Sequence, residues 1–232
     1  MDPLAGTPWS SPSTVEGFSR GEPNAVLMNY AARVIEAHAH PLAVDIGCGA
    51  GRNAVPLARS GWNVVGTDLS RPMLEAASAR VRNDTLRGRV VVLLAPMDAL
   101  PVADSSADLI VAHGIWNLAA SSSEMRRGVR EAARIARPGA ALFVFTFSRH
   151  TLPPDAEPVA AEPFVFTQFS GRPQCFLTEG QLLDEMTAAG FEPDPAVPLT
   201  EYNRPAPGAL RGVGAPVIYE AAFRRRRDAL RV

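Results

Sequence analysis

The chain has 232 residues, of which 47% are hydrophobic and 20% are charged. This composition is typical of a folded globular protein rather than a disordered one, and the length suits one α/β domain with an additional arm. The formal net charge of −1 supplies no basic field for a nucleic-acid backbone. No apolar run approaches the roughly 18 residues of a membrane span. We therefore expect neither a nucleic-acid nor a membrane partner.

The cysteines and the absence of lysine limit the cellular compartment and the catalytic mechanisms that the sequence allows. The two cysteines, Cys48 and Cys175, make no disulfide framework and fit a reducing, intracellular compartment. The first residues lack the basic segment and apolar run of a signal peptide, so we expect a cytoplasmic protein. All 23 basic residues are arginines, which excludes a Schiff-base lysine and a P-loop lysine on a nucleotide phosphate.

Strand and helix signals alternate up to about Phe147. Residues 1–23 are rich in Gly, Pro, Ser and Thr and predict an irregular arm, either mobile or closed over a pocket. Asn24 is an N-cap candidate for a helix that reaches about Ala39. Apolar runs separated by helices follow, which predicts a parallel sheet. The expected strands are 42–46, 63–67, 89–94, 107–112 and 140–146, and the expected helices are 53–60, 72–82 and 124–136, the last ended by Pro138-Gly139.

This alternation stops after Phe147. Residues 148–177 carry five prolines and an aromatic cluster, which favours an insertion over the C-terminal edge of the sheet; its phenylalanines either pack on the core or form an apolar substrate wall. Thr178 and Gln181 form a capping-box pattern for a helix up to Ala189. We expect 192–215 to be irregular and 217–223 to be the last strand. The arginine run 224–227 is either a solvated face or a patch for RNA or membrane.

The strongest motif is a glycine-rich turn that follows the first strand, Asp45-Ile46-Gly47-Cys48-Gly49-Ala50-Gly51. Glycines let the backbone turn sharply and approach a bound nucleoside closely. A dinucleotide site has the spacing G-x-G-x-x-G with a pyrophosphate at the helix N-terminus, whereas this turn is one residue tighter. A carboxylate beside it repels a pyrophosphate but suits an ammonium and a sulfonium. S-adenosylmethionine carries both groups and no phosphate.

Further acidic residues follow the next two strands. Asp68 ends the second strand, about twenty residues after the first glycine, at the spacing where an acid meets a ribose diol. Met97 and Asp98 follow the third strand, where the acid can accept the adenine amino hydrogens and the methionine can pack on the ring. Asp108 begins the fourth strand and is either part of this site or structural.

These residues together give the chain a family resemblance. From about Leu42 to Phe147 it resembles the class I S-adenosylmethionine-dependent methyltransferases, especially the bacterial group that includes small-molecule methyltransferases of the tellurite-resistance type. The resemblance implies a Rossmann-like, doubly wound, seven-stranded sheet, mostly parallel with an antiparallel last strand, plus an N-terminal helical arm. The motifs that carry it are Asp45–Asn53, Asp68-Leu69-Ser70, Asp98–Pro101, Ser106–Ile110 and Arg137–Ala140.

The resemblance also implies roles for single residues and an organisation for the chain. It places Asp45 near the methionine amino group, Asp68 on the ribose and Asp98 on the adenine amino group. The remaining residues expected at the cofactor are Gly47, Cys48, Gly49, Gly51, Leu69, Met97 and His113. We expect one domain over 1–232, made of an arm and helix (1–41), a cofactor-binding core (42–147) and a substrate-side part (148–232).

The segment after the fourth strand holds the candidate catalytic residues. His113 has the pKa range of a general base, although a histidine at a strand end is also commonly a hydrogen-bonded structural group. Trp116 and Asn117 either wall the substrate pocket or serve as a core aromatic and a helix cap. Tyr202, in an irregular segment, is a further candidate for substrate contact, and Arg20 in the arm is a candidate for the cofactor carboxylate.

The sequence therefore predicts S-adenosylmethionine-dependent methyl transfer to a small molecule, with the acceptor held in line with the methyl group and no metal ion. Two alternatives stay open. One is a protein of this fold that binds the cofactor without transferring methyl groups. The other is an RNA or tRNA methyltransferase, which is disfavoured because the segment His113–Trp116 lacks the Asp/Asn-Pro-Pro-aromatic pattern of amino-methylating enzymes. The methyl acceptor and the oligomeric state are not predicted.

Overall fold

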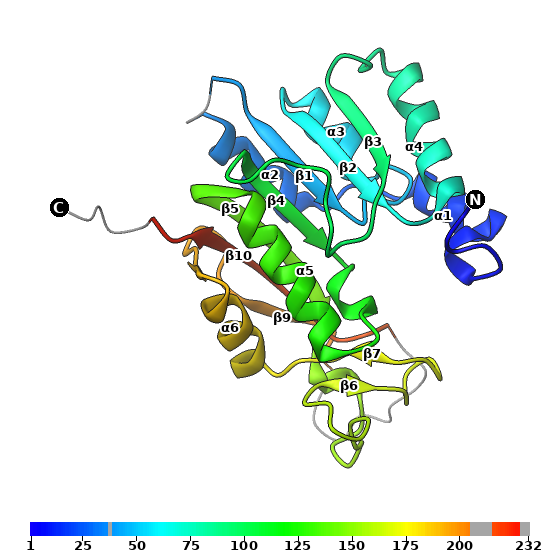
Figure 1. Cartoon of the computed structure of the whole chain (residues 1–232), viewed down its shortest axis with the longest axis vertical. Helices are drawn as coiled ribbons and strands as arrows, with labels where there is room; N and C mark the ends of the chain where they lie inside the picture. The colour runs from blue at the N-terminus through cyan, green and yellow to red at the C-terminus, as the bar shows by residue number, and fades with distance from the viewer. Residues whose placement is uncertain (37–38, 205–214, 228–232) are drawn as a thin grey trace.

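A single twisted sheet organises the chain in the computed structural model, which describes residues 1–36, 39–204 and 215–227. The strand order is β3-β2-β1-β4-β5-β10-β8, and a short strand, β9, also pairs with β10 (Figure 1). The bounds of these strands are β1 Leu42–Ile46, β2 Asn63–Asp68, β3 Val90–Leu94, β4 Ala107–His113, β5 Ala136–Phe147, β8 Phe191–Pro193, β9 Thr200–Tyr202 and β10 Ile218–Arg225.

The strand directions confirm the predicted α/β fold. Strands β1 to β5 pair in parallel, while β10 runs antiparallel to β5, β8 and β9. The sheet has one strand more than the predicted seven because β9 joins its edge. Residues 192–204 are therefore less irregular than expected, because they contain most of β8 and all of β9. Each of these strands has three residues, which are too few to give a periodic signal in the sequence. Residues 205–214 of the predicted irregular stretch lie outside the described residues.

Helices cover both faces of the sheet, as in a doubly wound fold. One apolar cluster lies under α5 (Ser122–Ile135) and α6 (Glu179–Ala188). The other lies under three helices, α2 (Ala25–Ile35), α3 (Ala54–Arg59) and α4 (Arg71–Asn83). Among the described residues no helix is long and apolar enough to cross a membrane.

Two predicted helix ends are wrong. The helix that Asn24 caps begins as expected, since the Asn24 side chain accepts a hydrogen bond from Leu27 N at 2.8 Å, but it ends at Ile35 rather than near Ala39; residues 37–38 lie outside the described residues. Helix α5 ends at Ile135, and Pro138-Gly139 already belongs to β5. The register of β4 and β5 shifts between Ala107 and Leu109, which accommodates the proline in a strand.

The N-terminal arm contains a helix, as the family resemblance implies, and is less irregular than its composition alone predicts. It contains a 3₁₀ turn, η1 (Pro8–Ser10), and a nine-residue helix, α1 (Pro12–Arg20), capped by the Ser11 side chain. Ser70 Oγ donates to Trp9 O at 3.1 Å, which ties the arm to the first turn of α4. The arm thus lies against the sheet edge where β2 ends (Figure 1).

The stretch after β5 forms a two-stranded hairpin, as an insertion at the far end of β5 (Figure 1). Its elements are η3 (Arg149–Thr151), β6 (Val165–Phe166) and β7 (Gln174–Cys175), whereas the short turn η2 (Trp116–Leu118) lies earlier in the chain, between β4 and α5. Phe164, Phe166 and Phe176 are buried, so these rings pack on the core, whereas Phe169 is 40% exposed. The predicted capping box of α6 is present, with Thr178 and Gln181 bonded reciprocally.

Candidate functional site

A cavity of about 630 Å³ lies where the carboxyl ends of β1, β2 and β4 meet the N-terminal arm. This is the edge at which open α/β sheets bind ligands, and the volume is in the usual range for such sites. The glycine turn, the ends of β2 and β4 and the residues after β3 form the floor and walls. The arm closes the other side with Leu4, Trp9, Phe18, Glu22, Pro23 and Asn24.

The three glycines of the turn each have a left-handed backbone, with φ of +69° at Gly47, +53° at Gly49 and +76° at Gly51. Side chains rarely adopt this conformation. A Cβ on Gly47 would also lie 2.8 Å from Ile115 Cδ1. Gly47 and Gly49 line the cavity, while a Cβ on Gly51 would meet Ala77 at 3.3 Å. Two glycines therefore shape the ligand surface, and the third lets the turn pack on α4.

Asp45 lies in β1 just before this turn and is 2% exposed. Burial raises its pKa to about 7, against the opposing effect of the nearby Arg52 guanidinium. Its Oδ2 atom is buried and has no hydrogen-bond partner among the described residues. An acceptor oxygen of this kind, left without a donor, costs folding free energy. The residue thus provides an unpartnered carboxyl oxygen directly beneath the glycine turn.

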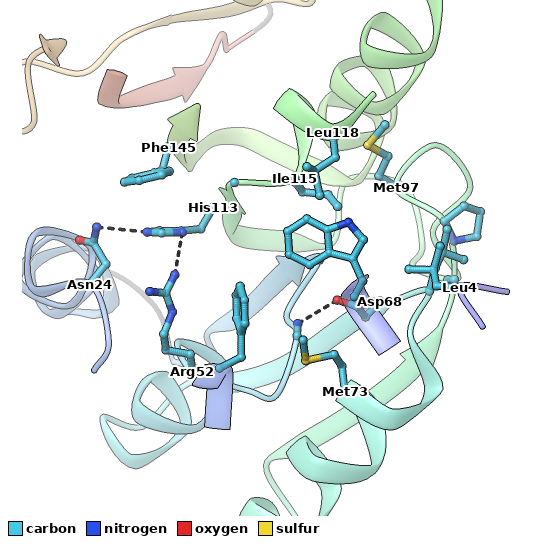
Figure 2. A pocket seen from close by; sticks show the side chains of 18 of the residues that line it. Leu4, Asn24, Arg52, Asp68, Met73, Met97, His113, Ile115, Leu118 and Phe145 are labelled. Carbon is cyan, nitrogen blue, oxygen red and sulfur yellow. Dashed lines mark hydrogen bonds between the residues drawn. The ribbon is translucent and has the colours of Figure 1, made fainter. Parts of the chain in front are cut away.

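Asp68 ends β2 and lines the same cavity. Its Oδ2 accepts from Gly49 N at 2.9 Å and its Oδ1 accepts from Ser70 N at 2.8 Å; the first bond is drawn in Figure 2. Burial raises the pKa of the carboxyl, and the two amide hydrogen bonds oppose that rise. Asp68 therefore fixes the glycine turn against β2 while its carboxylate borders the cavity.

Leu69, Met97 and Asp98 line the cavity beyond Asp68. Met97 and Leu4 of the arm both lie toward this end of the cavity in Figure 2. The Asp98 carboxylate accepts from Arg127 Nε at 2.9 Å in an ion pair that is half-exposed. These residues form an apolar slot with the Asp98 carboxylate at its end.

His113 lies at the opposite end of the cavity, stacked on Phe145 with ring centroids 4.2 Å apart. Its Nδ1 is 3.1 Å from an Arg52 guanidinium nitrogen, and its Nε2 is 3.2 Å from Asn24 Nδ2. Figure 2 shows both contacts. Burial, aided by the Arg52 charge, lowers the His113 pKa to about 4. The imidazole is therefore neutral near pH 7.

Several predicted site residues lie elsewhere. Trp116 and Asn117 are 1% and 2% exposed and do not line the cavity, because η2 turns them inward and Trp116 packs over Gly128 of α5. Tyr202 lies on β9, 39% exposed, and also outside the cavity lining. These placements do not support the prediction that the three residues contact substrate.

Other predictions concern residues that pack beneath or beside the cavity. Cys48 is buried within the turn and burial raises its pKa well above its usual range; like Gly51 and Asp45, it does not line the cavity itself. Asp108 accepts from Leu42 N and from Arg137 at the opposite edge of the sheet, which makes it structural. Arg20 pairs with Glu16 on the exposed side of α1, so the arm brings no arginine to the cavity.

The prediction missed the residues that complete the site. Arg52 directly follows the glycine turn, and that adjacency was a usable signal for it. Asn24 was recognised only as a helix cap, and Trp9 and Phe18 only as apolar anchors of a mobile segment. Their second role depends on how the arm folds back onto the sheet, with Trp9 and Phe18 in edge-to-face contact at 6.0 Å.

Comparison with known proteins supports the interpretation of this edge. Residues 44–144 match the model of the family described as methyltransferase domain. The methyltransferase GfsG of Streptomyces halstedii is 34% identical over 139 residues, which covers 59% of this chain and 48% of that protein. The demethylmenaquinone methyltransferase of Clavibacter sepedonicus is 32% identical over 111 residues, which covers 47% and 42%. The chain thus spans less than half the length of these relatives.

Solved structures extend the fold similarity to most of the chain. A SAM-dependent methyltransferase of Methanosarcina mazei has a TM-score of 0.69 at 20% identity, covering 90% of this chain and all of that one. The [4+2]-cyclase SpnF has a TM-score of 0.65 at 20% identity, covering 87% of this chain and 81% of that one. The sheet topology, the glycine turn and the sequence match agree on a methyltransferase domain over residues 44–144, within a chain that shares the fold of S-adenosylmethionine-dependent methyltransferases.

Proposed function

We propose that this protein binds S-adenosylmethionine in the cavity and transfers its methyl group to a small-molecule acceptor. The observation that carries the proposal is Asp45, a buried carboxylate with an unpartnered oxygen beneath a glycine turn. Asp45 lies beneath the cavity wall and does not line it, so it acts by charge through the turn: an ionised Asp45 repels a phosphate-bearing ligand and attracts an ammonium group. The residues present therefore fit the cofactor of the family.

The rest of the cavity follows the shape of that cofactor. Asp68 is suited to the ribose hydroxyls, since a carboxylate accepts two hydrogen bonds at once. Leu69 and Met97 are suited to the faces of adenine and Asp98 to its amino group. The methionine portion then lies along Gly47 and Gly49, toward Arg52 and His113. Of these residues, Figure 2 labels Met97 and Asp68 toward one end of the cavity and Arg52 and His113 toward the other.

When bound, the cofactor supplies an electrophilic methyl group that needs no further activation. The protein has to align an acceptor with that group and exclude water. Ile115, Leu118 and Phe145 give the cavity an apolar wall on which His113 stacks through Phe145, and residues of the N-terminal arm line the cavity on its other side. Alignment of this kind lowers a barrier by on the order of 7–11 kcal/mol in the best cases.

General-base catalysis by His113 stays a prediction, and its surroundings do not favour it. A pKa of about 4 makes the imidazole a weak base near neutral pH, and both ring nitrogens already contact side chains. Acceptors that lose their proton readily, such as thiols, acidic phenols and quinols, require no strong base. We therefore place such groups first among the acceptors to be tested.

The small-molecule assignment rests on the relatives and on charge. One relative is named for a demethylmenaquinone substrate, and the net charge of −1 supplies no overall basic field for a nucleic-acid backbone. We also propose a cytoplasmic location, from the free cysteines. The second candidate function is a reaction other than methyl transfer on the same fold, because the cyclase SpnF shares it.

The experiment that separates these functions has two stages. Calorimetric titration with S-adenosylmethionine and S-adenosylhomocysteine tests the cofactor site, with NADH as the comparison ligand. Incubation with S-adenosylmethionine and a panel of quinols, phenols, amines and thiols then tests for S-adenosylhomocysteine by mass spectrometry. Binding followed by product formation supports methyl transfer. Binding without product from any acceptor favours the second candidate, and absence of binding contradicts the proposal.

Trp9 provides an optical signal for cofactor binding. It lines the cavity, whereas Trp62 and Trp116 are 0% and 1% exposed in the core. We expect S-adenosylhomocysteine to change the tryptophan fluorescence, because adenosine stacking alters the surroundings of Trp9 alone. In Trp9→Phe the change should disappear while calorimetry still detects binding. A full fluorescence change in the variant would show that the arm does not contact the cofactor.

A further inference from the structure

His113 faces a conflict between two hydrogen-bond donors. A neutral imidazole has one N–H donor and one acceptor nitrogen, and the lowered pKa of His113 makes it neutral near pH 7. Arg52, which carries donors only, lies 3.1 Å from Nδ1, and the Asn24 amide nitrogen lies 3.2 Å from Nε2. The neutral imidazole can accept a hydrogen bond from only one of these two side chains. At its other ring nitrogen, the imidazole N–H therefore faces a second donor.

The orientation of Asn24 is fixed from three sides. Its Oδ1 accepts from Leu27 N at 2.8 Å as the cap of α2, and its Nδ2 donates to Glu220 Oε2 at 2.7 Å. Asn24 N also donates to Asn53 Oδ1 at 3.1 Å. Turning the amide over would lose the cap and set two oxygens against each other at Glu220, which is 4% exposed. Asn24 therefore donates to Nε2, and the His113 proton lies on Nδ1.

Arg52 is held less firmly. Within the described residues its guanidinium has no hydrogen bond other than the His113 contact, and it lies over the Phe18 ring at 5.9 Å. With the proton on Nδ1, the imidazole N–H and the Arg52 guanidinium are two donors whose nitrogens lie 3.1 Å apart, and both residues line the cavity. An anionic ligand oxygen that lies beside both nitrogens would accept from each of them.

The charges around the cavity indicate which ligand group can supply such an oxygen. Arg52 is the one cationic side chain among the described lining residues, whereas four carboxylates line the cavity, namely Glu22, Asp68, Asp98 and Glu124. A ligand carboxylate is repelled by those four and attracted by Arg52 alone. S-adenosylmethionine carries one carboxylate, at the end of the methionine portion, which the order of residues already brings to Arg52 and His113.

We infer that His113 and Arg52 together form the carboxylate subsite for this cofactor, and that Glu220 and Asn24 act as positioning residues that fix the His113 tautomer. His113 then donates from Nδ1 in its neutral form and abstracts no proton. This inference rests on the proposed cofactor, and it explains why a buried carboxylate on β10 is connected through Asn24 to a histidine on β4.

Two ligands test the subsite without any measurement of turnover. S-adenosylhomocysteine has the carboxylate, and S-adenosyl-3-thiopropylamine, its decarboxylated analogue, lacks it. Because hydrogen bonds to charged groups contribute roughly 1.5–3 kcal/mol, calorimetry should show that the wild-type protein prefers S-adenosylhomocysteine by about 10- to 100-fold. Arg52→Met should abolish that preference while its affinity for the analogue stays within about threefold of wild type.

Matched variants and one spectroscopic measurement test the tautomer. Arg80→Met removes another half-buried arginine beside the turn, bonded to Ala50 O, and should keep the preference. In the ¹⁵N spectrum, His113 should show a protonated Nδ1 and an unprotonated Nε2, both free and with S-adenosylhomocysteine bound. Asn24→Asp keeps a capping oxygen but presents an acceptor to Nε2, so the proton should move to Nε2 and the preference should fall. Asn24→Ser, which also caps, should lower the preference if the aspartate variant does not fold.

The outcomes distinguish this inference from the proposed function. If neither ligand binds the wild-type protein, the proposed cofactor is wrong and the inference falls with it. If both bind with equal affinity, or if His113 carries its proton on Nε2, the cofactor proposal stands and the carboxylate subsite is wrong. A loss of affinity for both ligands in Arg52→Met would assign Arg52 a purely structural role.

Discussion

Replacing Gly47 with alanine is expected to weaken S-adenosylhomocysteine binding by at least about 100-fold, which corresponds to roughly 2.7 kcal/mol. The backbone at Gly47 has φ of +69°, where a side chain costs about 1–2 kcal/mol. The new Cβ would also lie 2.8 Å from Ile115 Cδ1 and 2.9 Å from Ile115 Cβ. Ile115 lines the cavity, so either the turn or the cavity wall has to move.

Two further variants separate these causes. Gly180→Ala in α6 is a control, because no heavy atom lies within 4 Å of its added Cβ; it should leave binding unchanged and should not lower the melting temperature, since alanine favours a helix. Gly47→Ala combined with Ile115→Gly removes every one of these close contacts, including the one with Ile115 Cβ, but not the backbone strain, so it should recover part of the affinity. Calorimetry and thermal unfolding measure each effect. Binding within threefold of wild type in Gly47→Ala would contradict the placement of the cofactor along the turn.

The sequence predicts the sheet and the glycine turn because both have local signals. Each buried strand is a short apolar run, and the turn follows β1 with three glycines at alternate positions. Predictions failed where the deciding contact is distant. Pro138-Gly139 normally ends a helix, yet here the pair sits in β5, where the strand register shifts. Strand β9 has three residues and is defined by its pairing with β10 rather than by its own pattern.

The same distinction between local signals and distant contacts applies to the candidate site. Asp68, Leu69, Met97 and Asp98 could be predicted because carboxyl ends of parallel strands meet at one edge. The arm could not, since none of the residues of α1 is buried and its composition suggests a loop. Trp116 follows His113 by three residues and seemed to belong to the cavity, but η2 turns its side chain into the core. Neighbourhood in sequence therefore did not give the direction of the side chain.

Charge links the separate parts of the site. Four carboxylates and one arginine line the cavity, and a fifth carboxylate, Asp45, is buried below it. Such a cavity opposes nucleotides with phosphate groups and suits a ligand with two positive groups and one negative group. The arrangement also explains the low His113 pKa, since burial and Arg52 act on His113 in the same direction. The protonation of Asp45 also depends on this arrangement: burial raises its pKa, the Arg52 charge opposes that rise and the Asp68 charge adds to it.

Asp45→Asn is expected to weaken cofactor binding and to abolish its dependence on pH. Burial raises the Asp45 pKa from 3.8 to about 7, so the free protein holds a proton that an ionised carboxylate must release before it binds an ammonium group. Binding of S-adenosylhomocysteine to the wild-type protein should therefore strengthen by up to about tenfold per pH unit between pH 5.5 and 7. Calorimetry in two buffers of different ionisation enthalpy should detect the released proton.

The same pKa shift predicts an opposite effect on the stability of the free protein. Between about pH 4 and pH 7 the folded state holds the Asp45 proton that the unfolded state has lost, so the free energy of unfolding contributed by this group falls as pH rises. Asp45→Asn cannot ionise, and its melting temperature should therefore gain on that of the wild type over this range. Asp184→Asn, on the exposed side of α6, is the control and should match wild type in both measurements. Equal slopes of affinity against pH in the wild type and Asp45→Asn would show that the buried carboxylate does not interact with the cofactor. The reason is that this substitution removes the ionisable group at position 45 and keeps the size of the side chain.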